Sequence, residues 1–308
     1  MTRFDWTGVI PAITTPFLPD DQLDLEFLGE HARWMVAAGC TGIVAPGSLG
    51  EGATLSFEEK RALWSTLAQA LRGNAAPLAA IAATSTREAV REAQAAAAAG
   101  CVGLMVLPPY IYKGEWREMR AHFSAVIADT PLTCMLSNNP IAYGTDVLPG
   151  QMSELAALHP NLHAVKESSG DVRRITAIRE QLGSRLTLLV GMDDCLVEGV
   201  RAGARGWIAG LVNAFPAESV RLFELAQRGP STELDALYHW FLPLLRMDTT
   251  YDFVQRIKLA QQEVGRVGRG GARVRAPRMQ LDGQARQRDL DLLAAALLKR
   301  PVFRATLS

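Results

Sequence analysis

Lys166 has the sequence surroundings that most favour chemistry. It lies in the segment LHAVKESS, near the carboxyl end of an apolar run typical of a strand buried on both faces. Burial disfavours the charged form of a lysine and lowers its pKa, so more of the amine is free to attack a ketone and form a Schiff base. The alternative is an ion pair with Glu167, although adjacent strand residues face opposite sides. The sequence alone leaves both interpretations of Lys166 open.

A glycine-rich cluster, GSLGEG at residues 47–52, is the second candidate. It lacks the Gly-Lys-Ser/Thr of a P-loop and the Gly-x-Ser-x-Gly spacing of a nucleophile elbow. Two hypotheses remain for it. It is either a simple turn, or a bend whose exposed amides receive a small carboxylate with help from the Ser48 hydroxyl.

Eight short apolar runs must position these residues. They alternate with longer amphipathic, alanine-rich segments, and their continuous apolar character is typical of parallel strands covered on both faces. The runs cover residues 8–14, 41–47, 77–83, 103–109, 132–138, 162–168, 186–192 and 206–212. Eight strand–helix units predict an α/β protein with a (β/α)8 TIM barrel. An open doubly wound sheet is the alternative, but no Gly-x-Gly-x-x-Gly follows the first run.

The elements divide the chain into two regions. Residues 1–229 are expected to form the barrel, and residues 230–308 a C-terminal helical extension with helices at 233–247, 251–264 and 288–299. Ser56 and Glu59 have the spacing of a capping box, which predicts a helix start. Three glycines are expected to end helices in a left-handed conformation: Gly39, Gly100 and Gly203.

Composition excludes several function classes. The chain has 308 residues with 32 basic and 32 acidic side chains, so its net charge gives no reason to expect nucleic acid or a membrane as a partner. Its four cysteines and five histidines lack metal-site spacing, which favours free thiols and predicts no metal. No secretory signal or membrane span is evident, and we expect a cytoplasmic protein.

The barrel prediction selects the carboxyl ends of the strands as the place for chemistry. The selected segments are 14–16, 47–51, 108–110, 137–140, 166–168, 191–193 and 210–213. A Gly/Arg-rich segment at 265–278 lies outside this set. We interpret it as a solvated loop between helices, with anion binding as the alternative.

Taken together, these segments resemble the dihydrodipicolinate synthase / N-acetylneuraminate lyase family. The resemblance rests on GSLGE at 47–51, NNP at 138–140 and KESSGD at 166–171. It begins at GVIPAITTPF (8–17), continues through GMDD (191–194) and GLVN (210–213), and covers essentially the whole chain. The spaced combination is specific, whereas each motif alone is weak.

The resemblance implies a barrel enzyme, usually a homotetramer (a dimer of dimers), that needs no metal or organic cofactor. A lysine of the family condenses with pyruvate or a related 2-keto acid, and by position this is Lys166. Ser48 and the amide of Leu49 are implied to hold the substrate carboxylate. Ser137 and Tyr110 are further catalytic candidates. The remaining substrate-binding candidates are Gly47, Asn138, Tyr143, Gly191, Gly210 and Leu211.

Four positions depart from the family pattern. In the glycine-rich cluster, the family's pair of hydroxyl residues is here Ser48 followed by Leu49. Ser137 stands where a relay tyrosine is usual, Ile111 where one branch has a second tyrosine, and Ala142 at about the position of an arginine that binds the aldehyde substrate. Serine is a shorter donor with a far higher pKa than tyrosine. Tyr110, Tyr112, Tyr143 or a water molecule reached through Ser137 could replace the tyrosine.

These departures favour a Schiff-base lyase that dehydrates, deaminates or cleaves small 2-keto acids, as in sugar-acid or hydroxyproline breakdown. One alternative is 4-hydroxy-tetrahydrodipicolinate synthase of lysine biosynthesis. Another, from a different class, is a non-catalytic protein that binds a 2-keto acid.

Overall fold

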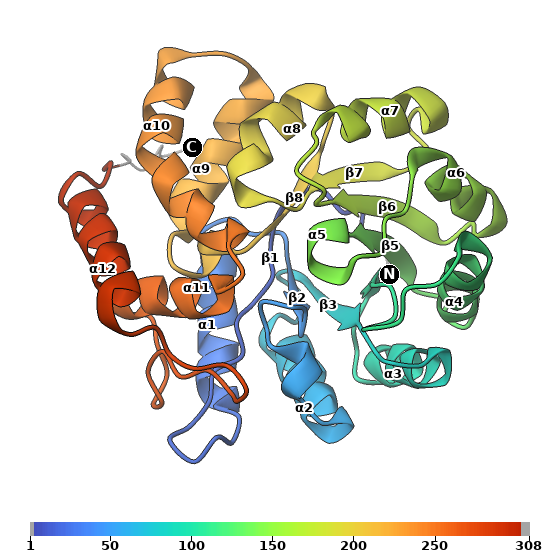
Figure 1. The fold of residues 1–308 in the computed structure, drawn as a ribbon, viewed down its shortest axis with the longest axis horizontal. Coiled ribbons are helices and arrows are strands. Elements are labelled where there is room, and N and C mark those ends of the chain that lie inside the picture. Colours follow the sequence, from blue (N-terminus) through green and yellow to red (C-terminus); the bar gives the residue numbers. More distant parts are fainter. Residues whose placement is uncertain (1–2, 303–308) are drawn as a thin grey trace.

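A computed structural model describes residues 3–302 and contains a (β/α)8 barrel, as the strand pattern predicts (Figure 1). Residues 1–2 and 303–308, the outer ends of the two predicted regions, lie outside the described residues. The strands are β1 (Gly8–Pro11), β2 (Gly42–Ala45), β3 (Ala76–Ile81), β4 (Gly103–Val106), β5 (Thr133–Asn138), β6 (Leu162–Glu167), β7 (Thr187–Val190) and β8 (Gly206–Ala209). Each lies within or close to one of the apolar runs.

All neighbouring strands pair in parallel, in the order β1-β8-β7-β6-β5-β4-β3-β2. A parallel bridge between Ala12 and Val44 joins the two ends of this sheet, so it closes on itself. An open doubly wound sheet is thereby excluded. Closure also brings all eight carboxyl ends of the strands to one mouth.

The helices surround the barrel and continue into the C-terminal region (Figure 1). They are α1 (Leu25–Ala37), α2 (Phe57–Ala70), α3 (Thr86–Ala98), α4 (Trp116–Ala128), α5 (Pro140–Tyr143), α6 (Pro149–Leu158), α7 (Arg173–Leu182), α8 (Leu196–Ala202), α9 (Pro216–Arg228), α10 (Thr232–Leu245), α11 (Phe253–Glu263) and α12 (Gly283–Leu298). Short 3₁₀ turns are η1 (Gly52–Thr54), η2 (Asp193–Cys195), η3 (Leu211–Asn213) and η4 (Arg246–Thr249). Within residues 3–302, no helix is both long and apolar enough to span a membrane.

Local sequence signals account for several helix boundaries. Ser56 and Glu59 form the predicted capping box at the start of α2. Gly39, Gly100 and Gly203 follow α1, α3 and α8 with positive φ angles of 109°, 98° and 118°, as predicted for helix-ending glycines. The last helix begins at Gly283, five residues before the expected 288.

The Gly/Arg-rich loop at 265–278 differs from the solvated loop expected for it. Its arginines form ion pairs with the barrel region: Arg269 with Asp24 at 3.1 Å, Arg273 with Asp21 at 3.1 Å, and Arg275 with Glu59 at 2.7 Å. The loop is therefore anchored to the N-terminal part of the chain. Sequence spacing did not reveal these partners because they are more than 200 residues away.

Candidate active site

The alternation of each strand places the candidate residues inside or outside the barrel. The interior core includes Met135, Ala164, Leu189 and Ile208, one from each of β5 to β8. Two residues further along each strand, the same face is continued at the mouth. The residues at these positions are Ser137, Lys166, Gly191 and Gly210.

Lys166 extends from β6 into the barrel mouth beside Gly191. A methyl group built on Gly191 would lie 2.3 Å from Cε of Lys166, so only glycine leaves room for this side chain. Burial lowers the pKa of Lys166, while the negative charges of Asp248, Asp193 and Glu167 act in the opposite direction. The net downward direction favours the unprotonated amine that a nucleophilic lysine requires.

Ser168 also faces the mouth, two residues beyond Lys166. Its hydroxyl oxygen is buried and has no hydrogen-bond partner among the described residues. A methyl group on Gly191 would lie 2.0 Å from this oxygen, so the side chains of Ser168 and Lys166 both lie against Gly191. An unpaired buried hydroxyl next to the lysine suits a polar group of a substrate. The sequence analysis included Ser168 in the selected segment 166–168 but did not single it out, although the two-residue period from Lys166 identifies it.

The glycine-rich cluster forms a tight bend at the end of β2. Within residues 3–302, no acceptor takes the amide hydrogens of Ser48 and Leu49. The Leu49 side chain is 4% exposed and packs in the larger hydrophobic core, separate from the barrel interior. This residue therefore offers only its backbone to a ligand. Gly50 lies so close to the carbonyl oxygen of Ile13 that a methyl group would approach it to 2.9 Å. This bend with unpaired amides is suited to a small anion.

Glu51 anchors the bend from the other side. Its backbone is left-handed with φ of 56°, and its side chain is fully buried. Lys258 of α11 donates to its carboxylate at 2.5 Å, and the amide of Arg275 donates at 2.9 Å. The Glu51 carboxylate is therefore occupied by the C-terminal region, and its role in the bend is to hold the backbone in place.

Tyr143 and Tyr110 meet at Ser48. The Tyr143 hydroxyl forms a hydrogen bond with the Ser48 hydroxyl, and the two tyrosine rings lie 5.9 Å apart. Burial is the main reason why the pKa of each tyrosine is raised, and the nearby Ser48 hydroxyl partly offsets the effect. Both phenols thus stay protonated and can donate. Tyr112, by contrast, lies on the surface and donates to Glu118 at 2.9 Å.

Asn138 and Leu211 lie near the mouth but engage other groups. The Asn138 amide donates to Asp146 at 3.2 Å and to Glu167 at 3.0 Å, and its oxygen accepts from Val147 at 2.9 Å. Leu211 donates its amide to Asp193 at 2.8 Å. Because Glu167 faces outward with Asn138, it does not share a face with Lys166, as strand alternation predicts.

Two acidic residues complete the mouth on the β7–β8 side. Asp193 of η2 is fully buried and accepts from the Trp207 indole at 2.9 Å and from the amides of Gly210 and Leu211. Burial raises the pKa of Asp193 to about 6 despite these donors. Asp248 of η4 lies over Gly210, and sequence reasoning missed it because no motif marks the short link between two predicted helices.

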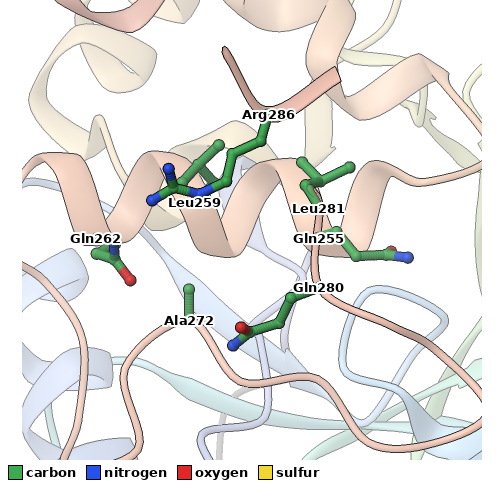
Figure 2. Close-up of a pocket in the computed structure, with 7 residues that line it drawn as sticks. All are labelled: Gln255, Leu259, Gln262, Ala272, Gln280, Leu281 and Arg286. Atoms are coloured by element: carbon green, nitrogen blue, oxygen red, sulfur yellow. The ribbon is translucent and has the colours of Figure 1, made fainter. Parts of the chain in front are cut away.

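One cavity of the molecule lies away from this site. It has a volume of about 60 Å³ and lies between α11, the following loop and α12, lined by Gln255, Leu259, Gln262, Ala272, Gln280, Leu281 and Arg286 (Figure 2). None of these side chains belongs to the barrel mouth. Within the described residues, no group of three or more His, Cys, Asp or Glu side chains is arranged to hold a metal ion.

Known proteins resemble the chain over nearly its whole length. Residues 5–296 match the Dihydrodipicolinate synthetase family. A 4-hydroxy-tetrahydrodipicolinate synthase of Methanoculleus marisnigri is 33% identical over 242 residues, which cover 78% of this chain and 82% of that protein.

Solved structures extend this similarity to the fold. A dihydrodipicolinate synthase from Aquifex aeolicus superposes with a TM-score of 0.89 at 25% identity, covering 95% of this chain and 98% of its own. YagE, a prophage protein of the dihydrodipicolinic acid synthase family from E. coli K12 in complex with pyruvate, gives 0.88 at 27% identity, covering 95% and 99%. The match of sequence and fold over both regions means that this chain belongs to the Dihydrodipicolinate synthetase family.

Proposed function

We propose that the chain is a Schiff-base-forming lyase for a small 2-keto acid, with Lys166 as the nucleophile. The observation that carries this proposal is the Lys166 side chain, which enters the barrel mouth beside Gly191 with a lowered pKa. A neutral amine attacks a keto carbon, and loss of water leaves a protonated imine that withdraws electrons from the adjacent carbon. The solved relative in complex with pyruvate supports a keto acid of this size.

The glycine-rich bend is the proposed site for the substrate carboxylate. The unpaired amides of Ser48 and Leu49 are donors that a carboxylate can accept, and Gly47 keeps the bend free of a side chain. β2 and β6 stand four strands apart around the closed barrel, so the bend and Lys166 lie on opposite sides of the mouth. The proposed keto acid lies between them.

Tyr143 is the proposed replacement for the missing tyrosine. Its hydroxyl bonds to Ser48 and can carry protons to and from the keto oxygen during imine formation, with Tyr110 behind it. Ser137 pairs with Lys166 in the strand register, which makes it a neighbour of the amine. We propose that Asn138 and Leu211 have supporting roles, since they donate hydrogen bonds to Glu167 and Asp193, respectively, near the mouth.

The proposed reaction is a dehydration, deamination or aldol cleavage of a 2-keto acid. Ala142 offers no side-chain donor at the position where the synthase branch is expected to bind its aldehyde, and this disfavours the synthase reaction. The synthase remains the second candidate because relatives at 33% identity are named for it. We also propose a cytoplasmic homotetramer without a metal or organic cofactor.

Reductive trapping tests the nucleophile. Pyruvate plus borohydride should add a reduced pyruvyl group to the peptide that contains Lys166, and Lys166→Arg should abolish this adduct. Lys113→Arg, which changes an exposed lysine, serves as the matched control and should trap normally. An unmodified Lys166 with pyruvate and with longer 2-keto acids would contradict the proposal.

A substrate panel separates the remaining functions. Sugar acids that can be dehydrated, hydroxy-pyrroline carboxylates and aldol donors are each tested with coupled detection of the 2-keto acid product. Turnover of one of them identifies the lyase reaction. Adduct formation without any turnover would instead identify a binding protein.

A further inference from the structure

Asp248 introduces a carboxyl group into the mouth from outside the barrel. It belongs to η4, between α10 and α11, and η4 packs against η2 at the end of β7. A methyl group built on Gly210 would lie 2.0 Å from Oδ1 of Asp248. The carboxyl oxygen therefore lies directly over the inward face of Gly210, at the carboxyl end of β8.

The Asp248 carboxyl has no fixed partner. Within residues 3–302, no backbone or side-chain group donates a hydrogen bond to it, and no basic side chain forms an ion pair with it. Arg246, two residues earlier, is 62% exposed and lies 3.8 Å from Asp194 instead. Asp193 differs, because three protein donors already hold its carboxylate. Asp248 is thus the acid at the mouth that remains free to exchange a proton.

The charged groups around Asp248 couple it to the lysine. Burial and the nearby Asp193 and Asp194 raise the pKa of Asp248, and Lys166 opposes this effect. Burial lowers the pKa of Lys166, and Asp248 is the strongest opposing charge. The pKa of Lys166 is lowered and that of Asp248 is raised, and the charge of each group opposes the shift of the other.

The strand order sets Asp248 opposite the tyrosines. With Lys166 on β6 and the carboxylate bend after β2, the mouth has a β3–β5 side and a β7–β1 side. Tyr110 and Tyr143 follow β4 and β5, whereas Asp248 covers the end of β8. A keto acid attached to Lys166 therefore has a phenol pair on one side and a free carboxyl group on the other.

We propose that Asp248 is a catalytic acid–base residue that removes and returns the proton on the carbon next to the imine. This inference rests on the proposed Schiff-base function. The Asp248 carboxylate accepts a proton from C3, and the electrons of the broken C–H bond form the C2=C3 double bond. The electron pair of the C=N double bond returns to the Lys166 nitrogen. A protonated imine and a carboxylate thus become a neutral enamine and a neutral carboxylic acid, and the reverse step restores both.

Deuterium exchange into pyruvate tests the step without knowledge of the physiological substrate. In D₂O, the native chain should exchange the methyl hydrogens of pyruvate, as measured by NMR. Asp248→Asn should lower the exchange rate by about 100-fold or more, as expected for loss of a general base. The fraction trapped by borohydride at equilibrium should stay near the native value. Asp235→Asn on α10 removes one exposed carboxylate as the matched control and should exchange normally.

The outcomes separate this inference from the proposed function. If the native chain forms no adduct with pyruvate or longer 2-keto acids, the proposed function fails. If Asp248→Asn forms the adduct and exchanges at the native rate, only the role of Asp248 is overturned. A purely electrostatic role would move the pH dependence of adduct formation to lower pH and leave the maximal exchange rate unchanged.

A second variant guards against loss of folding. Should Asp248→Asn be unfolded by circular dichroism, Asp248→Glu keeps a titratable carboxyl group and displaces it by one methylene. Exchange that is slowed but still follows titration of the carboxyl group supports the proposal. Exchange at the native rate and with the native pH profile overturns it.

Discussion

At the scale of single residues, the proposed site combines a lysine, two tyrosines and a free carboxyl group at the barrel mouth. Their roles follow from what each already contacts. Lys166 lies beside Gly191, Tyr143 bonds to Ser48, and Asp248 has no donor among the described residues. Asp193 and Glu167 also carry carboxylates near the mouth. Protein groups already donate hydrogen bonds to both, so we propose that they support neighbouring residues.

The pH dependence of adduct formation should reveal the shifted lysine. Only the neutral amine attacks a ketone, so the rate at low pyruvate concentration should rise with pH as Lys166 loses its proton. Because burial lowers the pKa of Lys166, this rise should be complete at a lower pH than for an ordinary lysine of pKa about 10.4. Quenched borohydride trapping across a pH series measures it. A midpoint at the ordinary lysine value would contradict the burial of the amine.

Replacement of the phenol should slow imine formation. Tyr143→Phe removes the hydroxyl that bonds to Ser48 and should reduce the rate of adduct formation by about 100-fold, the lower range for general acid–base catalysis. Tyr112→Phe is the control, since its hydroxyl contacts the surface residue Glu118. Rapid-quench trapping compares the two. Equal rates in Tyr143→Phe and the native chain would mean that a group other than Tyr143 transfers the proton.

At the scale of elements, the mouth depends on contacts between distant segments. The glycine-rich bend after β2 is held by Glu51, which is bonded to Lys258 of α11. η4 brings Asp248 over the end of β8, and the loop after α11 pairs with α1 and α2 regions through its arginines. The C-terminal elements thus contribute residues to the proposed site and contact the N-terminal part of the chain.

Breaking the buried ion pair should affect both stability and binding. Lys258→Met leaves the Glu51 carboxylate without its closest cation, which is expected to reduce the free energy of unfolding by about 3–5 kcal/mol. The loosened bend should also weaken pyruvate binding. Chemical denaturation and trapping titrations measure these effects. The double variant Glu51→Gln/Lys258→Met should recover part of the stability, and failure to do so would show that the charge pairing is not the cause.

At the scale of the whole molecule, the barrel and the C-terminal helices form one structure around a common core. The Trp240 indole of α10 donates to Ala296 of α12 at 3.1 Å, and Arg256 of α11 pairs with Asp289 of α12 at 2.7 Å. Phe215, just before α9, stacks edge-on against Trp240 and Phe241. These contacts join the helices to each other and to the barrel wall.

Removal of residues 230–308 should therefore abolish function as well as stability. A chain that ends at Gly229 exposes Phe215 and lacks both Asp248 and Lys258. We expect little soluble folded protein and no pyruvate adduct, measured by circular dichroism and borohydride trapping. A truncated chain that unfolds cooperatively and still traps pyruvate on Lys166 would mean that the barrel is independent of the helices.

The sequence by itself predicted the barrel, the position of Lys166 near the carboxyl end of a strand with Glu167 on the opposite face, and the glycine-rich cluster after the second strand. These features depend on short-range patterns: apolar runs, a two-residue strand period, and glycines at tight turns. Tertiary structure alone decided that Tyr143 meets Ser48, that Asn138 is engaged with Glu167, and that Asp248 covers Gly210. Such contacts join distant segments of the chain; Tyr143 and Ser48, for example, are 95 residues apart. No local pattern encodes them, because they arise only when barrel closure brings the strand ends and the C-terminal helices to one mouth.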